Sequence, residues 1–315
     1  MAEFRNNLPQ LEGGLFLTDG GIETTLIFHE GIDLPHFASF DLLREIDGKE
    51  ALRKQFASYA AIARDHGVGC ILETPTWRAS SDWGDKMGYS KVALGAVNKE
   101  AVSLLMDIRK DYQNETTPIV ICGGLGPRGD GYVASEIMSA DQAQRYHAPQ
   151  VAALCRAGAD LIGAMTMTNT GEAIGVTRAA MAEGIPVVIS FTVETDGLLP
   201  TGQSLKDAIT EVDAVTDNAP VYYMINCAHP THFQHLLDSD EDWLLRLRGI
   251  CANASCMSHA ELDAAEELDD GSPVELAGQF KNIRGRQKHI NVLGGCCGTD
   301  SRHIDQIGHH CKSLH

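Results

Sequence analysis

The stretch "HINVLGGCCGTD" (residues 289–300) joins an apolar run to two glycines, two adjacent cysteines and a third glycine. The apolar part, residues 290–293, predicts a short buried strand, and the glycines predict a sharp turn directly after it. A disulfide between neighbouring cysteines closes a strained ring and constrains the unfolded chain little. Cys296 and Cys297 are therefore either incidental, or they place two sulfurs at one point in space.

Seven other short apolar runs share this strand-like character, and longer helical stretches lie between them. Continuous apolar strands are typical of a parallel sheet that is buried on both faces. The eight expected strands cover residues 14–19, 69–74, 118–124, 159–166, 186–193, 221–227, 247–254 and 290–295. Helices are expected, among others, over residues 50–66, 91–112, 141–157, 171–183 and 204–217.

Eight such units in a chain of this length predict an α/β fold, a single-domain (β/α)8 TIM barrel spanning residues 1–315. A doubly wound open sheet would normally carry a G-x-G-x-x-G turn after its first strand, and "DGG" at 19–21 does not match. The acidic stretch around 256–274 interrupts the alternation before the last strand. We interpret it as a solvated loop insertion.

Composition excludes several classes of function. The 315 residues are 43% hydrophobic, yet no run approaches the roughly 20 apolar residues that span a bilayer. A net charge of −18 argues against nucleic-acid and membrane partners. The N-terminus has no apolar signal segment, which predicts a cytoplasmic protein. Nine irregularly spaced cysteines do not indicate a disulfide framework. The oligomeric state cannot be read from these features.

The carboxyl ends of the strands of a barrel meet on one face, where active sites of this fold lie. Cys227 ends the sixth expected strand, and Cys296 and Cys297 end the eighth. Three thiolates with one open position are what a catalytic Zn²⁺ site requires. Two alternatives remain at this point: a redox switch through a bridge between Cys296 and Cys297, or ordinary buried cysteines.

Six segments resemble the homocysteine S-methyltransferase family, nearly end to end and in its order. The pairing of Asn-Cys with Gly-Gly-Cys-Cys-Gly-Thr is the most specific of them. The segments are "TDGGIETTL" (18–26), "GLGPRGD" (124–130), "YHAPQVAALCRAGADLI" (146–162), "SFTVETDGLLPTGQSL" (190–205), "INCAHP" (225–230) and "LGGCCGTD" (293–300).

The resemblance implies a zinc-dependent methyltransferase that makes methionine from homocysteine, a role in methionine biosynthesis. Its zinc ligands would be Cys227, Cys296 and Cys297. The metal would hold and activate the substrate thiolate, so no protein residue beyond the zinc ligands needs a catalytic role. The thiolate would attack a methyl group of a small sulfonium or ammonium donor. The substrate-binding positions that the resemblance implies are Asp19, Gly20 and Gly21 after the first strand and Asn226, which orients the metal loop.

One position departs from the family pattern. Relatives carry a glutamate at the end of the fourth strand, where it binds the substrate amino group, and this chain has Met165 there. A thioether cannot replace that carboxylate. We expect Glu73, at the end of the second strand, to replace it. Met165 is also compatible with another thiol or selenol acceptor, or with a zinc- or redox-responsive binding barrel that has lost catalysis.

We expect the methyl donor to contact aromatic residues after the second and third strands, because aromatic faces bind methylated cations. Trp77 is the expected donor contact, with Trp83, Tyr89 and Tyr132 as further candidates. Betaine-using relatives carry an aromatic residue where this chain has Arg78. A guanidinium there repels an ammonium group, which favours S-methylmethionine or another sulfonium over betaine.

Overall fold

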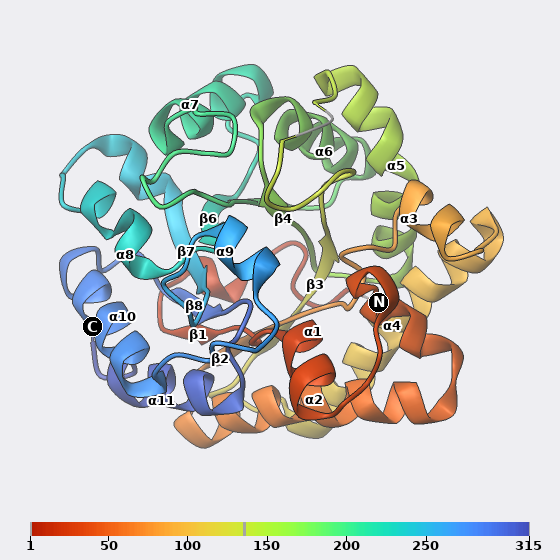
Figure 1. Ribbon diagram of the computed structural model, residues 1–315, viewed down its shortest axis with the longest axis horizontal. Coiled ribbons are helices and arrows are strands. Elements are labelled where there is room, and N and C mark those ends of the chain that lie inside the picture. The colour runs from red at the N-terminus through yellow and green to blue at the C-terminus, as the bar shows by residue number, and fades with distance from the viewer. Residues whose placement is uncertain (1, 135–136, 315) are drawn as a thin grey trace.

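The computed structural model describes residues 2–134 and 137–314 and forms a closed barrel of eight parallel strands in chain order (Figure 1). The first strand closes the barrel, because Phe16 pairs with Gly69 on one side and with Val292 on the other. The predicted TIM barrel is confirmed. The strands are β1 (Phe16–Leu17), β2 (Gly69–Glu73), β3 (Ile119–Leu125), β4 (Leu161–Met167), β5 (Val187–Phe191), β6 (Tyr222–Asn226), β7 (Leu247–Ala252) and β8 (Val292–Gly295).

Helices surround the barrel, and the five predicted helices are present with ends that differ by a few residues at most. Several end at a glycine in the left-handed conformation, such as Gly67 (φ 65°) and Gly158 (φ 103°), which stops the helix before the next strand. The helices are α1 (Ile22–Thr24), α2 (Ile46–His66), α3 (Ser81–Lys86), α4 (Lys91–Tyr112), α5 (Ala140–Ala157), α6 (Thr170–Glu183), α7 (Leu205–Thr216), α8 (Pro230–Phe233), α9 (His259–Ala264), α10 (Pro273–Arg286) and α11 (Ser301–Cys311).

The hydrophobic core has two parts. The larger part lies between the strands and the surrounding helices, and the smaller part fills the barrel interior. Leu8 packs into the smaller part, and Gln10 approaches Tyr222 of β6. The N-terminal segment therefore fills one end of the barrel, which leaves the opposite end, where the strands finish, for a site.

The acidic segment around 256–274 is not entirely loop. It contains the short helix α9, which begins with a capping box between Ser258 and Glu261. In Figure 1 this helix lies near the centre of the view, in front of the barrel strands. Leu262 and Leu268 from this segment line the central cavity. Of the helices that the structure describes, none has the length and apolar character needed to span a membrane.

Candidate active site

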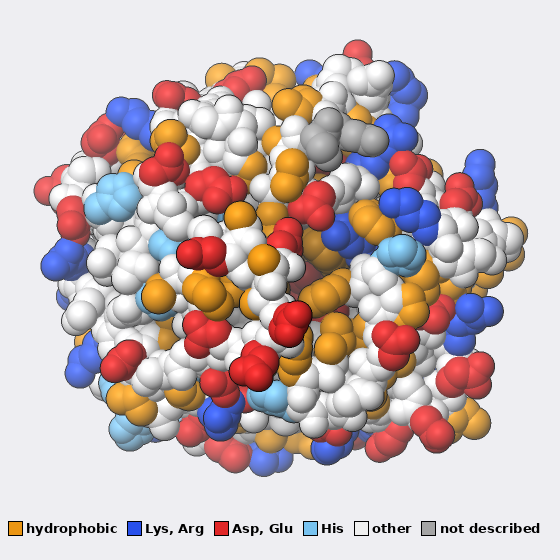
Figure 2. All heavy atoms as spheres, viewed as in Figure 1, with side chains coloured by type: hydrophobic (Ala, Val, Ile, Leu, Met, Phe, Trp, Pro, Cys, Tyr) orange, Lys and Arg blue, Asp and Glu red, His pale blue; other side chains and the backbone are white. Residues whose placement is uncertain are grey.

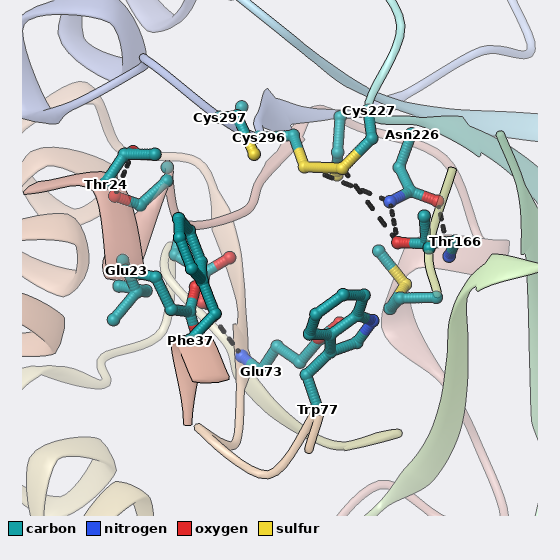
Figure 3. Close-up of a pocket in the computed structure, with 18 of the residues that line it drawn as sticks. Glu23, Thr24, Phe37, Glu73, Trp77, Thr166, Asn226, Cys227, Cys296 and Cys297 are labelled. Atoms are coloured by element: carbon teal, nitrogen blue, oxygen red, sulfur yellow. Dashed lines mark hydrogen bonds between the residues drawn. A yellow bond between two sulfur atoms is a disulfide. The ribbon is translucent and has the colours of Figure 1, made fainter. Parts of the chain in front are cut away.

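The three cysteines selected from the sequence lie together at the end of the barrel where the strands finish. The Sγ atoms of Cys227, Cys296 and Cys297 are all within 4.8 Å of one another. Cys227 follows β6 and the other two follow β8, so the cluster joins positions 69 residues apart in the chain. Figure 3 shows them on one side of a pocket, with Glu73 and Trp77 on the other.

Strand β7 holds the two cysteine loops in register. The backbone N–H of Cys227 donates to Cys251 O at 3.1 Å, and that of Cys296 donates to Ala252 O at 2.8 Å. Cys227 has φ +53°, a conformation that is uncommon for a residue with a side chain and that ends β6 abruptly. Because these loops are pinned to a common strand, their sulfurs converge without further adjustment of the fold.

The structure corrects the redox alternative drawn from the adjacent cysteines. Cys227 and Cys296 are joined as a disulfide, and Cys297 is free. A bridge between neighbours would require a strained ring, whereas cysteines on two separate loops can approach one another without one. Any metal site made by these sulfurs requires the reduced protein.

Asn226 connects three strand ends to the cysteine cluster. Its Oδ1 accepts hydrogen bonds from Thr166 N (2.8 Å) and Ser190 Oγ (2.6 Å). Its Nδ2 donates to Thr166 Oγ1 at 2.8 Å and lies 4.0 Å from Cys296 Sγ. Because both ends of the amide are engaged by protein atoms, Asn226 is suited to orienting the metal loop, as the sequence suggested.

Met165 lies at a bulge in the fourth strand. The pairing of β4 with β5 shifts between Ala164 and Met167, so β4 carries one more residue than β5 over this interval. Thr166 takes φ +59°, which is rare for a β-branched residue. The bulge turns Met165 into the cavity, where it is half-buried. The position that carries a carboxylate in relatives therefore faces the site here as a thioether.

Glu73 reaches the same region from β2 because two glycines leave room for its side chain. A Cβ on Gly124 would lie 2.6 Å from Glu73 Oε1, so only glycine fits at that position of β3. A Cβ on Gly163 would lie 3.5 Å from Glu73 Oε2 and 3.7 Å from Met165 Sδ. The carboxylate of Glu73 thus lies beside the methionine that stands in place of the family glutamate.

Three of the acidic groups that line the cavity are buried at its wall, and burial is the largest influence on the pKa of each. Burial raises the pKa of Asp19 to about 7, with Glu23 adding to the shift. Burial also raises the pKa of Glu23, which the hydrogen bond from Ser39 Oγ (2.6 Å) opposes. The pKa of Glu73 is raised well above its usual range by burial and by the charge of Asp19. A bound cation would favour ionisation of these groups.

The glycines after β1 are needed for close packing. A Cβ on Gly21 would lie 2.5 Å from Cys296 O, and one on Gly20 would lie 2.8 Å from Tyr59 Oη. The N–H of Gly21 donates to both the carbonyl and the hydroxyl of Thr299, at 3.0 and 3.1 Å. Gly21 therefore brings α1 against the cysteine loop, and its amide is not free for substrate. A substrate contact through Asp19 and Gly20 stays a prediction.

Aromatic residues line the cavity, which has a volume of about 520 Å³. Trp77, Trp83 and Tyr132 are among them, as the sequence suggested. Tyr89 is not: it packs against Phe40 and donates to Asp41. In Figure 2 the face is hollowed near its centre, with acidic and hydrophobic side chains around the hollow.

Two site residues were not found from the sequence. Glu23 faces the cavity from the first turn after "DGG", and His259 of α9 joins the cysteine loop. His259 Nε2 lies 2.7 Å from Cys227 O, and its ring stacks on Tyr132 with centroids 4.0 Å apart. Tyr132 Oη lies 3.5 Å from Cys297 Sγ. No local pattern marks His259, because its partners come from segments distant in the chain.

Comparison with known proteins finds relatives along most of the chain. A family model described as homocysteine S-methyltransferase matches residues 16–311. Homocysteine S-methyltransferase 4 of Zea mays is 24% identical, with 94% of this chain and 89% of that protein covered. Homocysteine S-methyltransferase YbgG of Bacillus subtilis is 23% identical, with 79% and 81% covered. The metallated form of the homocysteine methyltransferase MmuM from Escherichia coli superimposes with a TM-score of 0.76 at 20% identity, covering 98% and 99% of the two chains.

Proposed function

The chain belongs to the homocysteine S-methyltransferase family, and we propose that it transfers a methyl group from a small sulfonium or ammonium donor to the thiolate of homocysteine, giving methionine, with zinc held by Cys227, Cys296 and Cys297. The observation that carries the proposal is the convergence of three cysteine sulfurs within 4.8 Å at the wall of a cavity. Three sulfur ligands with the fourth position facing a cavity are the donor set of an open zinc site. A zinc ion bound there lowers the pKa of a substrate thiol and fixes its sulfur.

The residues of the chain orient the two substrates. Asp19 and Glu73 offer carboxylates for the ammonium group of homocysteine, on the side of the cavity opposite the cysteines for Glu73 (Figure 3). Trp77, whose ring lines the cavity, helps to exclude water from the donor. In the transfer, the acceptor sulfur forms a bond to the methyl carbon while the donor's carbon–sulfur or carbon–nitrogen bond breaks. The electron pair of that bond remains on the donor, whose reacting atom becomes a neutral sulfide sulfur or amine nitrogen.

A second acceptor class is favoured by Met165 alone. If Glu73 does not bind the substrate amino group, a thiol or selenol without that group would fit the same cysteine cluster. Identifying the acceptor therefore distinguishes homocysteine methylation from methylation of another thiol or selenol.

Zinc-edge X-ray absorption on reduced protein, with and without L-homocysteine, tests the proposal without requiring a known donor. We expect three sulfurs and one lighter ligand, changing to four sulfurs when homocysteine is added. The Cys297→Ser variant should lose one sulfur from this shell, whereas Cys256→Ser, at an exposed cysteine away from the cluster, should not.

Absence of a zinc–sulfur shell would overturn the proposal. A shell of three sulfurs that stays unchanged at saturating homocysteine would indicate that the acceptor is another thiol or selenol.

A further inference from the structure

Arg78 is a buried cation that contacts no carboxylate of the residues that the structure describes. It lies on the loop after β2, lines the cavity, and its side chain is only 7% exposed. One guanidinium nitrogen donates to Gly129 O at 2.8 Å, and Nε has no partner. Among residues 2–134 and 137–314, no carboxylate oxygen lies within 4.0 Å of its nitrogens. Buried charges in proteins are normally paired, because an unpaired one costs several kcal/mol.

The two carboxylates whose charges act most strongly on Arg78 accept hydrogen bonds from other groups. Asp130 and Glu23 both act on Arg78 through their charges. The carboxylate of Asp130 accepts from the N–H groups of Tyr132 and Val133, at 2.7 and 3.2 Å. Glu23 accepts from Ser39 Oγ. These groups reduce the cost of burying Arg78 but leave its contact positions free for an anion from outside the chain.

Two tryptophans hold the guanidinium in a fixed plane. The Arg78 Cζ atom lies 4.0 Å from the ring centroid of Trp77 and 3.9 Å from that of Trp83. Trp83 is itself anchored, because its Nε1 donates to Arg128 O at 3.0 Å. A planar, pre-oriented guanidinium offers its edge to a carboxylate in a bidentate contact. Lysine could not reproduce this geometry.

The cavity therefore has two chemically distinct regions. Asp19, Glu73 and the cysteines present acidic and sulfur groups, and Arg78 presents the positive charge. If the first region holds the acceptor, as the proposed function requires, Arg78 is left for the donor. We propose that Arg78 is a specificity-determining residue that binds a carboxylate of the methyl donor, so that the donor is a compact zwitterion. This inference rests on the proposed function.

Steady-state methylation of homocysteine with two sets of donors tests the inference. Dimethylsulfoniopropionate, S-methyl-L-methionine and glycine betaine carry a carboxylate, whereas trimethylsulfonium and tetramethylammonium do not. The wild-type protein should prefer at least one carboxylate-bearing donor. In Arg78→Gln, kcat/KM for that donor should fall by about 10–100-fold, the range for a lost charge-assisted contact. The carboxylate-free donors should change by less than about threefold, and Arg78→Lys should restore the preference only in part.

The KM for homocysteine shows whether Arg78 binds the carboxylate of the donor or that of the acceptor. The KM for homocysteine should be unchanged in Arg78→Gln, and a rise in that KM with no effect on the donor would overturn the inference. Equal use of both donor sets by wild type and variant would also overturn it, while leaving the proposed function intact.

A binding measurement is independent of turnover. Quenching of tryptophan fluorescence by 3-(methylsulfanyl)propionate, the demethylated product of the first donor, should depend on Arg78, and ethyl methyl sulfide should have no such effect. Arg78-dependent binding of that carboxylate without transfer to homocysteine from any donor would refute the proposed function but not the carboxylate contact. If neither transfer nor Arg78-dependent binding is seen, both fail.

Discussion

The carboxylate of Glu73 and the thioether of Met165 both approach Gly163, since a Cβ on that residue would lie 3.5 Å from Glu73 Oε2 and 3.7 Å from Met165 Sδ. Glu73 comes from β2 and Met165 from β4, so the expected replacement of the family glutamate by Glu73 can be tested at these two positions.

Exchanging these positions is a direct test of that relationship. Glu73→Gln should raise the KM for homocysteine by about tenfold or more, because a hydrogen-bonded ion pair to the substrate ammonium is lost. Adding Met165→Glu to that variant should recover most of the affinity. Glu73→Gln with unchanged affinity for homocysteine, measured by titration at constant zinc, would show that Glu73 does not bind the amino group.

Asp19 should make the stability of the protein depend on pH. Its pKa is raised to about 7 in the folded chain, from 3.8, chiefly by burial. Between these values the folded state binds more protons than the unfolded state. The contribution is therefore fully present below about pH 4 and is lost as the pH rises through 7. Asp19→Asn should gain stability relative to wild type between pH 5 and pH 8, by an amount on the order of 1 kcal/mol.

Urea unfolding of both proteins at the two pH values measures this difference. Asp65→Asn is the control, because that carboxylate is 67% exposed. Parallel pH profiles for wild type and Asp19→Asn would contradict the expected burial of this carboxyl group.

His259 should support the cysteine cluster from outside it. Its ring contacts the carbonyl of Cys227 and stacks on Tyr132, so its loss frees the loop that carries one expected ligand. His259→Ala should weaken zinc binding by about tenfold, the lower end of the range for residues that support ligands. Competition with a chelator measures this affinity, and exposed His235→Ala should leave it unchanged. Equal zinc affinity in His259→Ala and His235→Ala would show that α9 covers the cavity without supporting the metal site.

Alanine substitutions at two glycines should have opposite effects on the stability of the protein. A Cβ on Gly294 would lie 1.7 Å from Thr18 Oγ1, between β8 and the end of β1, so Gly294→Ala should lower the melting temperature markedly. Gly95 lies inside α4 with nothing within 4 Å of the same point. Gly95→Ala should stabilise the protein by about 0.5–1 kcal/mol, because alanine has the higher helix propensity. Calorimetry distinguishes the two, and a stable Gly294→Ala variant would show that Thr18 can move away.

The order of elements was predictable because it depends on local pattern. Eight buried apolar runs separated by amphipathic stretches identify a barrel, and the strand ends then place Cys227 with Cys296 and Cys297. The bulge at Met165 was not predictable, because it depends on how β4 pairs with β5. The helix within the acidic insertion was also missed, since its charge suggested a solvated loop.

The sequence by itself determined the barrel and the three cysteines that meet at its mouth, since hydrophobic periodicity and residue chemistry are properties of the chain alone. Only the tertiary structure decided which distant groups meet. It brought Glu73 and Met165 to the same glycine, placed His259 against Cys227, and left Arg78 between two tryptophans with no acidic partner among the described residues. These contacts depend on side-chain directions and on space left by glycines, and both exist only once the barrel has closed.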